Sequence, residues 1–300
     1  MRKIFITVLL FLPLSIFAQS AGSSGLSFLK LGFGARNIAM GDVGAAASND
    51  VSALFYNPAN LVNTYSNEIM LMHNSWIQGV YSNILGVKTN IFGLPVAAGV
   101  DVTTINDIQV RTAPSTLPDA TFNANYFFGS LSTGFHLTDD LAFGFSVKYL
   151  YEGLYIDEAT GLGFDFGLNY STPVDGLTAV AVVRDLGSMN KLKNESTKLP
   201  SEFRIGPAYK FYLNHNLFEI TAAAELQKYF LENNIHSDWG IEVVYNDLIA
   251  LRGGYRTGYE AKGFSAGMGI MWGTLEFDYA FQPFNYGLGS ANIFSLQFKF

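Results

Sequence analysis

The residues of this chain that could do chemistry are charged side chains set at alternate positions among apolar and small residues. Alternation of this kind places them on one face of a β-strand. Because both signs are present, this face could carry ion pairs around a wet interior, or a dedicated ligand site; we expect ion pairs. The candidate charges on this face are Lys148, Asp165, Arg204, Glu242, Arg252, Arg256, Glu276 and Asp278.

Two arginines in this set share a strand face. Arg252 and Arg256 are four positions apart, and the preceding strand carries Glu242. Together the two guanidinium groups could hold an anionic headgroup, or they could pair with Glu276 and Asp278. We favour the pairing, because a charge that leaves water needs a partner.

Catalytic, metal-binding and nucleic-acid-binding functions are disfavoured. The chain has no Cys, only four His, and a net charge of −7. The His residues are scattered, with His215 expected in a turn and His236 in a loop, so they do not converge on one site. A nucleic-acid partner would require a surplus of Lys and Arg. We therefore predict no enzyme activity, no metal, no cofactor and no nucleic-acid partner.

The amino terminus has the layout of an export signal. Arg2 and Lys3 precede a mostly apolar stretch over 4–17, and Ala18 offers a small residue at a cleavage point. The stretch is too short for a membrane-spanning helix. We predict a signal peptide over residues 1–18.

The rest of the chain is dominated by alternating strands. From Leu275 to Phe281, for example, large apolar residues alternate with Glu276, Asp278 and a small residue. A soluble β-sandwich or a membrane barrel could give this period. The aromatic content of 15%, the low charged content of 14% and the length of the strands favour a barrel with its apolar face toward lipid.

We predict an all-β fold, a fourteen-stranded antiparallel transmembrane β-barrel over 64–300. An even count places both barrel termini in the periplasm, with short periplasmic turns and longer outer loops. The longer loops expected include 106–122, 154–160 and 188–201, and apolar residues in 106–122 and 188–201 make these two candidates for partner contact. The expected strands are 66–77, 80–90, 94–105, 124–136, 141–153, 161–171, 176–187, 202–212, 217–230, 237–246, 249–257, 262–272, 273–283 and 292–300.

Residues 19–63 have no such alternation and are rich in Gly and Ala. Helical patches are expected at Ala35–Met40 and Asp50–Tyr56, followed by the turn Asn57-Pro58-Ala59. About forty residues of this composition cannot form a stable domain alone. We expect them to fold inside the barrel as a hatch, or plug.

A family resemblance is carried by this segment. The run from Gly34 to Ala46, followed by Asn-Pro-Ala-Asn-Leu at 57–61, resembles the PorV/PorQ family, within the wider group of FadL-like barrels. The resemblance implies a fourteen-stranded outer-membrane barrel with an N-terminal hatch. It points to a hatch turn at Asn57, Pro58 and Ala59, and to hatch motif residues Ala35, Arg36, Met40, Gly41, Asp42 and Gly44.

The resemblance implies one of two roles, and a purely structural barrel is the third possibility. PorV-like members take part in type IX secretion and hold exported proteins at the cell surface, which is the main hypothesis. FadL-like members are passive channels for hydrophobic small molecules such as fatty acids, which is the alternative. The implied partners are outer-membrane lipid, secretion-system components and exported cargo. Phe298 and the terminal Phe300 resemble the signal read by the barrel assembly machinery.

Overall fold

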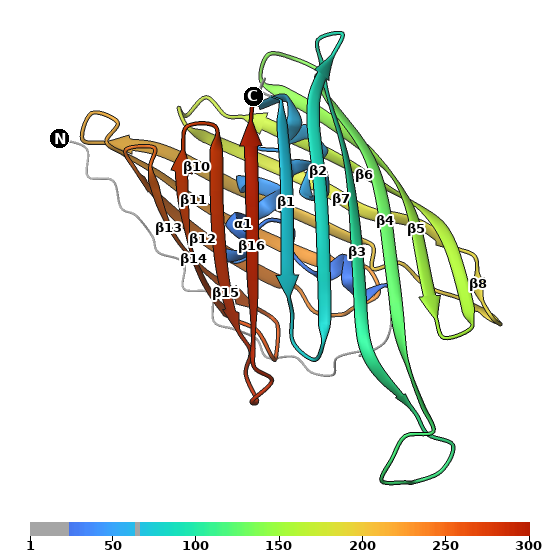
Figure 1. The fold of residues 1–300 in the computed structure, drawn as a ribbon. Helices are drawn as coiled ribbons and strands as arrows, with labels where there is room; N and C mark the ends of the chain where they lie inside the picture. Colours follow the sequence, from blue (N-terminus) through green and yellow to red (C-terminus); the bar gives the residue numbers. More distant parts are fainter. Residues whose placement is uncertain (1–23, 64–66) are drawn as a thin grey trace.

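The strands form one closed antiparallel barrel, which confirms the predicted fold class (Figure 1). The structure is a computed structural model that describes residues 24–63 and 67–300. The predicted signal peptide lies outside the described residues. In the described part, fourteen strands follow one another around the ring, and the ring is closed by pairing of β1 with β16.

The observed strands lie close to the expected ones. Their bounds are β1 Glu68–Ser75, β2 Val80–Ile91, β3 Leu94–Val110, β4 Ala120–His136, β5 Leu141–Leu154, β6 Asp157–Ser171, β7 Leu177–Met189, β10 Glu202–Leu213, β11 Phe218–Tyr229, β12 His236–Tyr245, β13 Ile249–Thr257, β14 Phe264–Trp272, β15 Leu275–Pro283 and β16 Ser290–Lys299. A separate two-stranded hairpin, β8 Lys191–Leu192 with β9 Glu195–Ser196, lies in the connection between β7 and β10.

Alternation along each strand separates the two faces of the wall. In β15 the Phe277 side chain is 47% exposed on the outer face, whereas Asp278 is fully buried on the inner face. Large apolar side chains occupy the outer face and charged or small ones the inner face. This is the reverse of a soluble sandwich and is the arrangement expected of a barrel in lipid.

Connections differ in length between the two ends of the barrel. We call the end where β1 begins and β16 finishes the terminal end, and the opposite one the loop end. Connections at the terminal end, such as 92–93 and 273–274, have at most five residues, whereas 190–201 at the loop end has twelve. Among the described residues, no helix is long and apolar enough to cross a membrane.

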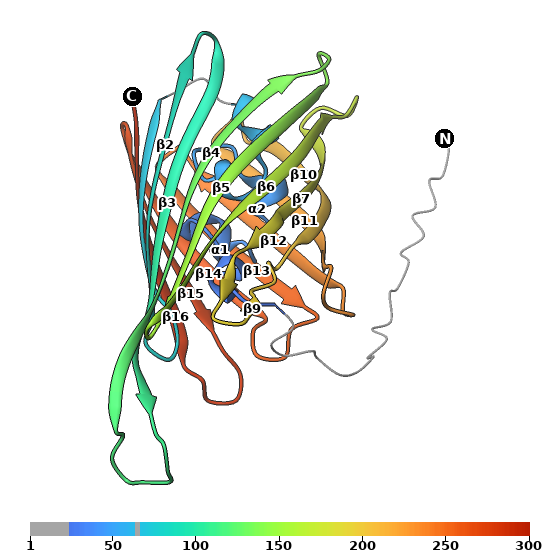
Figure 2. The same ribbon diagram turned by 90° about the vertical axis from the view of Figure 1, so that its right-hand side faces the viewer.

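Two of the predicted outer loops are shorter than expected. β3 and β4 continue pairing out to Val110 and Ala120, past a bulge where Asp107 has φ 58°, so the predicted loop 106–122 shrinks to 111–119. The resulting hairpin projects well beyond the barrel (Figure 2). Likewise the predicted loop 154–160 is only the turn 155–156. Outside the apolar band these strands carry polar residues on both faces, so no alternation marked them.

Residues 24–63, here called the N-terminal segment, lie inside the ring of strands (Figures 1 and 2). The helix α1 packs against β13 to β16, α2 against β7, β10 and β11, and η2 against β3 to β6. Contacts on all sides of the ring place the segment in the lumen. Its elements are η1 Ser27–Lys30, α1 Ala35–Ala39, α2 Gly44–Ala47, α3 Ala53–Tyr56 and η2 Pro58–Asn63. The helix α2 was not expected from the sequence.

An apolar core fills the loop-end half of the lumen. Phe28 and Phe33 of the N-terminal segment pack with Phe55 of α3 and with the wall residues Met72 and Phe128. Ring stacking of Phe33 on Phe55, with centroids 4.8 Å apart, fixes part of this core. The segment thus lies across the lumen with an apolar side toward the loop end.

Candidate functional site

The first group of lumen charges joins the N-terminal segment to β12 and β13. Arg36 donates to Glu242 from Nε at 2.9 Å and from Nη2 at 2.7 Å, and from Nη1 to the carbonyl of Ala47. Arg252 lies opposite Glu242 in the register and meets it at 2.5 Å. All three charged groups are buried. The geometry gives Glu242 two guanidinium partners from two different parts of the chain.

Arg252 also crosses β14 to reach the next strand. It pairs with Asp278, and at 3.3 Å with Glu276, both on β15. A Cβ on the intervening Gly269 would crowd the Arg252 guanidinium and the Asp278 carboxylate. Because Gly269 has no side chain, Arg252 can reach across β14 to Asp278. Arg252 therefore forms the pairing expected from the sequence.

Arg256 does not take that pairing. It meets Asp238, its opposite neighbour on β12, at 3.0 Å, and Asp42 of the N-terminal segment at 3.1 Å. The expectation that Arg256 pairs with Glu276 or Asp278 is wrong, because Arg256 lies four residues beyond Arg252 on β13, two lumen-facing positions farther from those acids and opposite Asp238. Asp42 was predicted as a motif residue, but not as its partner.

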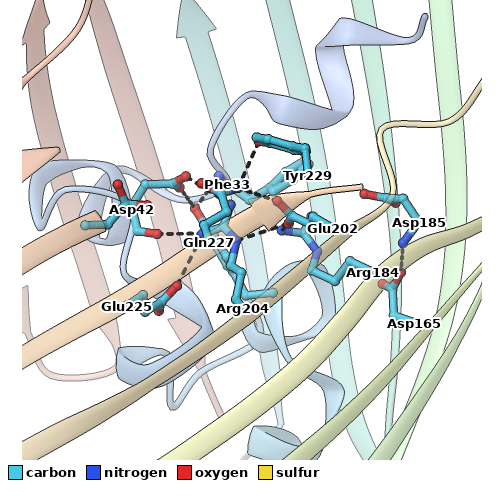
Figure 3. Close-up of polar contacts among 12 residues, drawn as sticks. Phe33, Asp42, Asp165, Arg184, Asp185, Glu202, Arg204, Glu225, Gln227 and Tyr229 are labelled. Atoms are coloured by element: carbon cyan, nitrogen blue, oxygen red, sulfur yellow. Dashed lines mark hydrogen bonds and ion pairs between the residues drawn. The ribbon is translucent and has the colours of Figure 1, made fainter. Parts of the chain in front are cut away.

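A second charged group surrounds Asp42 (Figure 3). Arg204 of β10 donates from Nη1 to the Asp42 carbonyl at 2.9 Å and pairs with its carboxylate at 3.4 Å. The same guanidinium meets Glu202 at 3.1 Å and Glu225 at 3.4 Å. Tyr56 donates its hydroxyl to Asp42 at 2.5 Å. Asp42 is thereby fixed by groups from three different elements.

The third group depends on a bulge in β7 that the alternation pattern does not predict. Lys148 contacts Asp165 at 2.8 Å and Asp185 at 2.6 Å. In β7 the pairing with β6 shifts by one residue, so both Arg184 and Asp185 face the lumen. Arg184 pairs with Glu202 at 2.8 Å. The sequence does carry a sign of this bulge: the adjacent charged residues Arg184 and Asp185, followed by Gly187, in an otherwise apolar strand.

The small residues of the hatch motif let the segment pack directly on the wall. Gly41 has φ 74°, and a Cβ there would overlap the carbonyl of Trp239 and crowd the backbone of Tyr255. A Cβ on Gly44 would strike the ring of Tyr56. Ala35 and Met40 are fully buried, and the Ala35 amide donates to Ser295 at 2.8 Å.

The hatch turn also packs directly against the barrel wall, nearer the terminal end. Asn57 donates to the carbonyl of Leu168 at 3.1 Å and accepts from the Ala59 amide at 3.1 Å. A Cβ on Gly144 would overlap the backbone where Pro58 joins Ala59. The turn and the wall therefore approach at backbone distance.

The predicted assembly signal lies on the outer surface of the last strand. Phe298 and Phe300 are stacked, with centroids 5.3 Å apart, and both are exposed. Phe300 also exchanges two backbone hydrogen bonds with Asn67. These contacts position both rings at the terminal end, where the barrel closes.

A cavity of about 400 Å³ opens at the loop end, and we call it the mouth pocket. Trp76 and Phe284 meet edge to face across 5.1 Å and form one side, while His236 and Tyr259 stack at 4.0 Å on another. Leu31, Trp76 and Phe284 also pack on the apolar core. The charged residues of its lining are Lys30, Glu232, Glu260 and Lys262.

His236 is placed differently from its prediction. It is the first residue of β12 and is buried, not part of a loop. Its Nε2 lies 3.3 Å from Glu232. In the part of the chain that the structure describes, no group of three or more His, Cys, Asp or Glu is arranged to hold a metal ion.

Two charged loop residues of the mouth pocket have shifted acidities. Burial alone would raise the pKa of Glu232, but the hydrogen bond and charge of Lys30, 2.7 Å away, hold it below its usual value. Burial, with a smaller effect from the charge of Arg256, lowers the pKa of Lys262 to about 7. The pocket thus holds the carboxylate of Glu232 and the partly buried amino group of Lys262.

A second cavity, of about 440 Å³, lies at the terminal end. Its lining includes Arg36 and the end of α2, together with hydroxyl and amide side chains such as Thr221 and Asn169. The N-terminal segment therefore contributes to one cavity at each end of the lumen. The mouth pocket differs from the terminal-end cavity in having Trp76, Tyr229, Tyr259 and Phe284 among its charged and polar lining residues.

No protein-family model and no curated protein matches the chain. Solved structures do match it. The toluene transporter TbuX of Ralstonia pickettii is 15% identical, with 90% of this chain and 98% of that one covered and a TM-score of 0.61. The toluene transporter TodX of Pseudomonas putida is 14% identical, with 89% and 98% covered and a TM-score of 0.63.

A FadL homologue of Pseudomonas aeruginosa is also similar, at 12% identity, with 89% and 97% covered and a TM-score of 0.56. At these identities the likeness shows the fold. None of the three comparisons singles out the PorV/PorQ family or type IX secretion. By their names, TbuX and TodX are transporters. The chain therefore has the fold of FadL-type outer-membrane barrels.

Proposed function

We propose that this protein is an outer-membrane channel for hydrophobic small molecules. One observation carries the proposal: a pocket with Trp76 and Phe284 on one side opens at the loop end and adjoins an apolar lumen core, within a barrel whose fold is that of TbuX and TodX. Leu31, Trp76 and Phe284 belong to both the pocket and the edge of the core. An apolar molecule that enters the pocket therefore meets apolar side chains next.

The N-terminal segment acts as the hatch in this proposal. Its buried ion pairs through Arg36 and Asp42 fix it to the wall, and its apolar residues fill the lumen. A fixed plug keeps water and solutes from leaking while apolar molecules pass by displacement of apolar contacts. The loop end faces outward and the terminal end faces the periplasm, which the even strand number and the short terminal-end turns support.

The first test is genetic. We expect a strain that lacks this protein to take up radiolabelled toluene or oleate more slowly, and the wild-type gene to restore uptake. A variant with Trp76→Ala should restore it poorly. Trp272→Ala is the matched control, because Trp272 lies exposed on the outer face at the terminal end. Uptake of both compounds that is unchanged by the deletion would count against the channel.

Type IX secretion, or surface attachment of exported proteins, is the second candidate. The resemblance over 34–61 favours it, and so does the β3–β4 hairpin that projects from the loop end. Leu117 in the loop of this hairpin is 77% exposed, and Ile156 in the β5–β6 turn at the same end is 82% exposed, which suits contact with another protein. Deletion of the gene should then leave exported cargo in the periplasm, and normal secretion by the mutant would exclude this role.

Two further partners follow from the barrel itself. The exposed apolar outer face suits outer-membrane lipid. Phe298 and Phe300 at the end of β16 suit recognition by the barrel assembly machinery. Truncation of Phe300 should lower the yield of assembled barrel in the outer membrane, without changing the activity of each barrel that does assemble.

A further inference from the structure

The mouth pocket contains an ammonium group without an acidic partner. Lys262 lies in the loop between β13 and β14, half-buried, with its Nζ 4.5 Å from the centre of the Tyr259 ring. Within the described residues it forms no ion pair. An ammonium has three hydrogen-bond donors and no acceptor, so a contact with a ring leaves its donors available.

The backbone of Lys262 is held in place. It forms a β-bridge with Phe284, so the loop that carries the ammonium is tied to the loop that carries one aromatic side of the pocket. Arg256 donates to the Tyr259 hydroxyl at 2.9 Å, which fixes the ring beneath the ammonium. The backbone of Lys262 is therefore fixed beside both Tyr259 and Phe284.

The acids near Lys262 are already engaged. Glu232 meets Lys30 at 2.7 Å and His236 at 3.3 Å. In the lumen beside the pocket, Asp42 and Asp238 are paired with Arg256. The remaining carboxylate of the lining, Glu260, is exposed to solvent. The pocket thus has a spare positive charge and no spare buried negative charge, so it suits an anion and not a cation.

One side of the lining suits a flat apolar body. Trp76 and Phe284 present faces and edges set at 76° to one another, and Leu31 closes the side toward the core. A cavity of about 400 Å³ lies in the size range of small-ligand pockets. Aromatic rings pack on such surfaces with offset or edge-to-face geometry.

We propose that the mouth pocket binds anionic aromatic molecules, such as aryl carboxylates, with the ring against Trp76 and Phe284 and the anionic oxygens on Lys262. This deepens the proposed channel function, on which it rests, by naming a substrate class that differs from the neutral hydrocarbon toluene. Recognition combines a charge-assisted hydrogen bond with ring packing, so a molecule that offers only one of the two binds less tightly.

The test uses two probes of the same ring. Binding of 4-fluorobenzoate and of 4-fluorotoluene to the full-length protein in lipid nanodiscs is measured by fluorine NMR at pH 6, where the ammonium is charged. We expect 4-fluorobenzoate to bind at least tenfold more tightly. Lys262→Met should remove this preference and leave 4-fluorotoluene within about twofold of its wild-type affinity, because a charge-assisted hydrogen bond is worth roughly a factor of ten or more.

Lys193→Met is the matched control, since Lys193 is an exposed lysine of another loop at the same end. It should change neither affinity. Trp76→Ala should weaken both probes. Equal affinities of the two probes for the wild type, or a 4-fluorobenzoate affinity that Lys262→Met leaves unchanged in a folded barrel, would overturn the proposal.

Toluene and benzoate uptake by the same variants separates this inference from the channel function. Protein-dependent toluene uptake without benzoate binding would overturn the substrate class and retain the channel. Benzoate binding that depends on Lys262, in a protein that transports neither compound, would retain the pocket and overturn the channel.

Discussion

Arg36 of α1 and Glu242 of β12 form a buried two-point ion pair between residues 206 positions apart in the chain. Both side chains are more than nine-tenths buried. The pair ties the centre of the N-terminal segment to the barrel wall, and Arg252 completes the charge balance around Glu242. The segment is thus fixed in the lumen by an interaction that neither part could make alone.

Breaking this pair should destabilise the barrel strongly. Arg36→Met leaves Glu242 buried with one guanidinium partner, and loss of one member of a buried pair costs about 3–5 kcal/mol. Lys30→Met, which breaks the more solvent-exposed pair with Glu232, should cost less, about 1 kcal/mol. Urea unfolding of the barrel in lipid vesicles measures both. Similar costs for the two variants would show that the Arg36 pair does not anchor the segment.

The close approach of Gly41 to the wall should be sensitive to a single methyl group. Gly41→Ala adds a Cβ that overlaps the Trp239 carbonyl. Gly273→Ala is the control, because Gly273 also has a positive φ, 61°, but open space around it. We expect the control to lose about 1 kcal/mol through backbone conformation and Gly41→Ala to lose clearly more. Thermal unfolding in lipid compares the two, and equal losses would argue against the contact.

The outer face should reject charge. Phe277→Arg places a guanidinium on the lipid-facing side of β15 and should cost about 2–4 kcal/mol if the site is near the bilayer midplane. Phe277→Leu keeps the face apolar and should change the stability little. The free energy of unfolding in lipid vesicles distinguishes them. A tolerated arginine would place this face away from lipid.

Lys262 should react as an amine at unusually low pH. Its pKa of about 7, lowered mainly by burial, makes the neutral amine the major form above pH 7, whereas an ordinary lysine has a pKa near about 10.4. Acylation of the native protein at pH 8, followed by peptide mass spectrometry, should label Lys262 ahead of other lysines. Its labelling rate should rise between pH 6 and 8 and then level off. A rate that rises only at alkaline pH would contradict the buried environment.

The barrel could be predicted from the sequence. A wall with one face toward lipid and the other toward the lumen requires strict alternation of apolar residues with small or polar ones along each strand. Phe277 and Asp278 show the principle: neighbours in sequence, they face lipid and lumen. The ends of β3 and β4 were missed because, beyond the apolar band, both faces meet water and alternation disappears. Strand pairing continues there through backbone hydrogen bonds, which carry no signature in side-chain type.

The lumen site could be predicted only in part from the sequence. The alternation along each strand predicts which charged residues, such as Arg204, face the lumen. Their partners depend on where the N-terminal segment lies. Asp42 meets Arg204 and Arg256 only because Gly41 allows the chain to lie directly on the wall. Asp185 was not predicted, because a bulge in β7 shifts the alternation by one residue and turns Asp185 toward the lumen together with its neighbour Arg184.

The most direct test of the channel is transfer through the purified protein. Barrels reconstituted in lipid vesicles would be given radiolabelled toluene outside and a trapped enzyme that oxidises toluene inside, and product would be measured over time. A bilayer alone passes toluene, so vesicles whose outer leaflet is lipopolysaccharide are used to set a low background. We expect product formation that rises with the number of wild-type barrels, falls with Trp76→Ala and is unchanged by Trp272→Ala. Product formation equal to that of protein-free vesicles would contradict it.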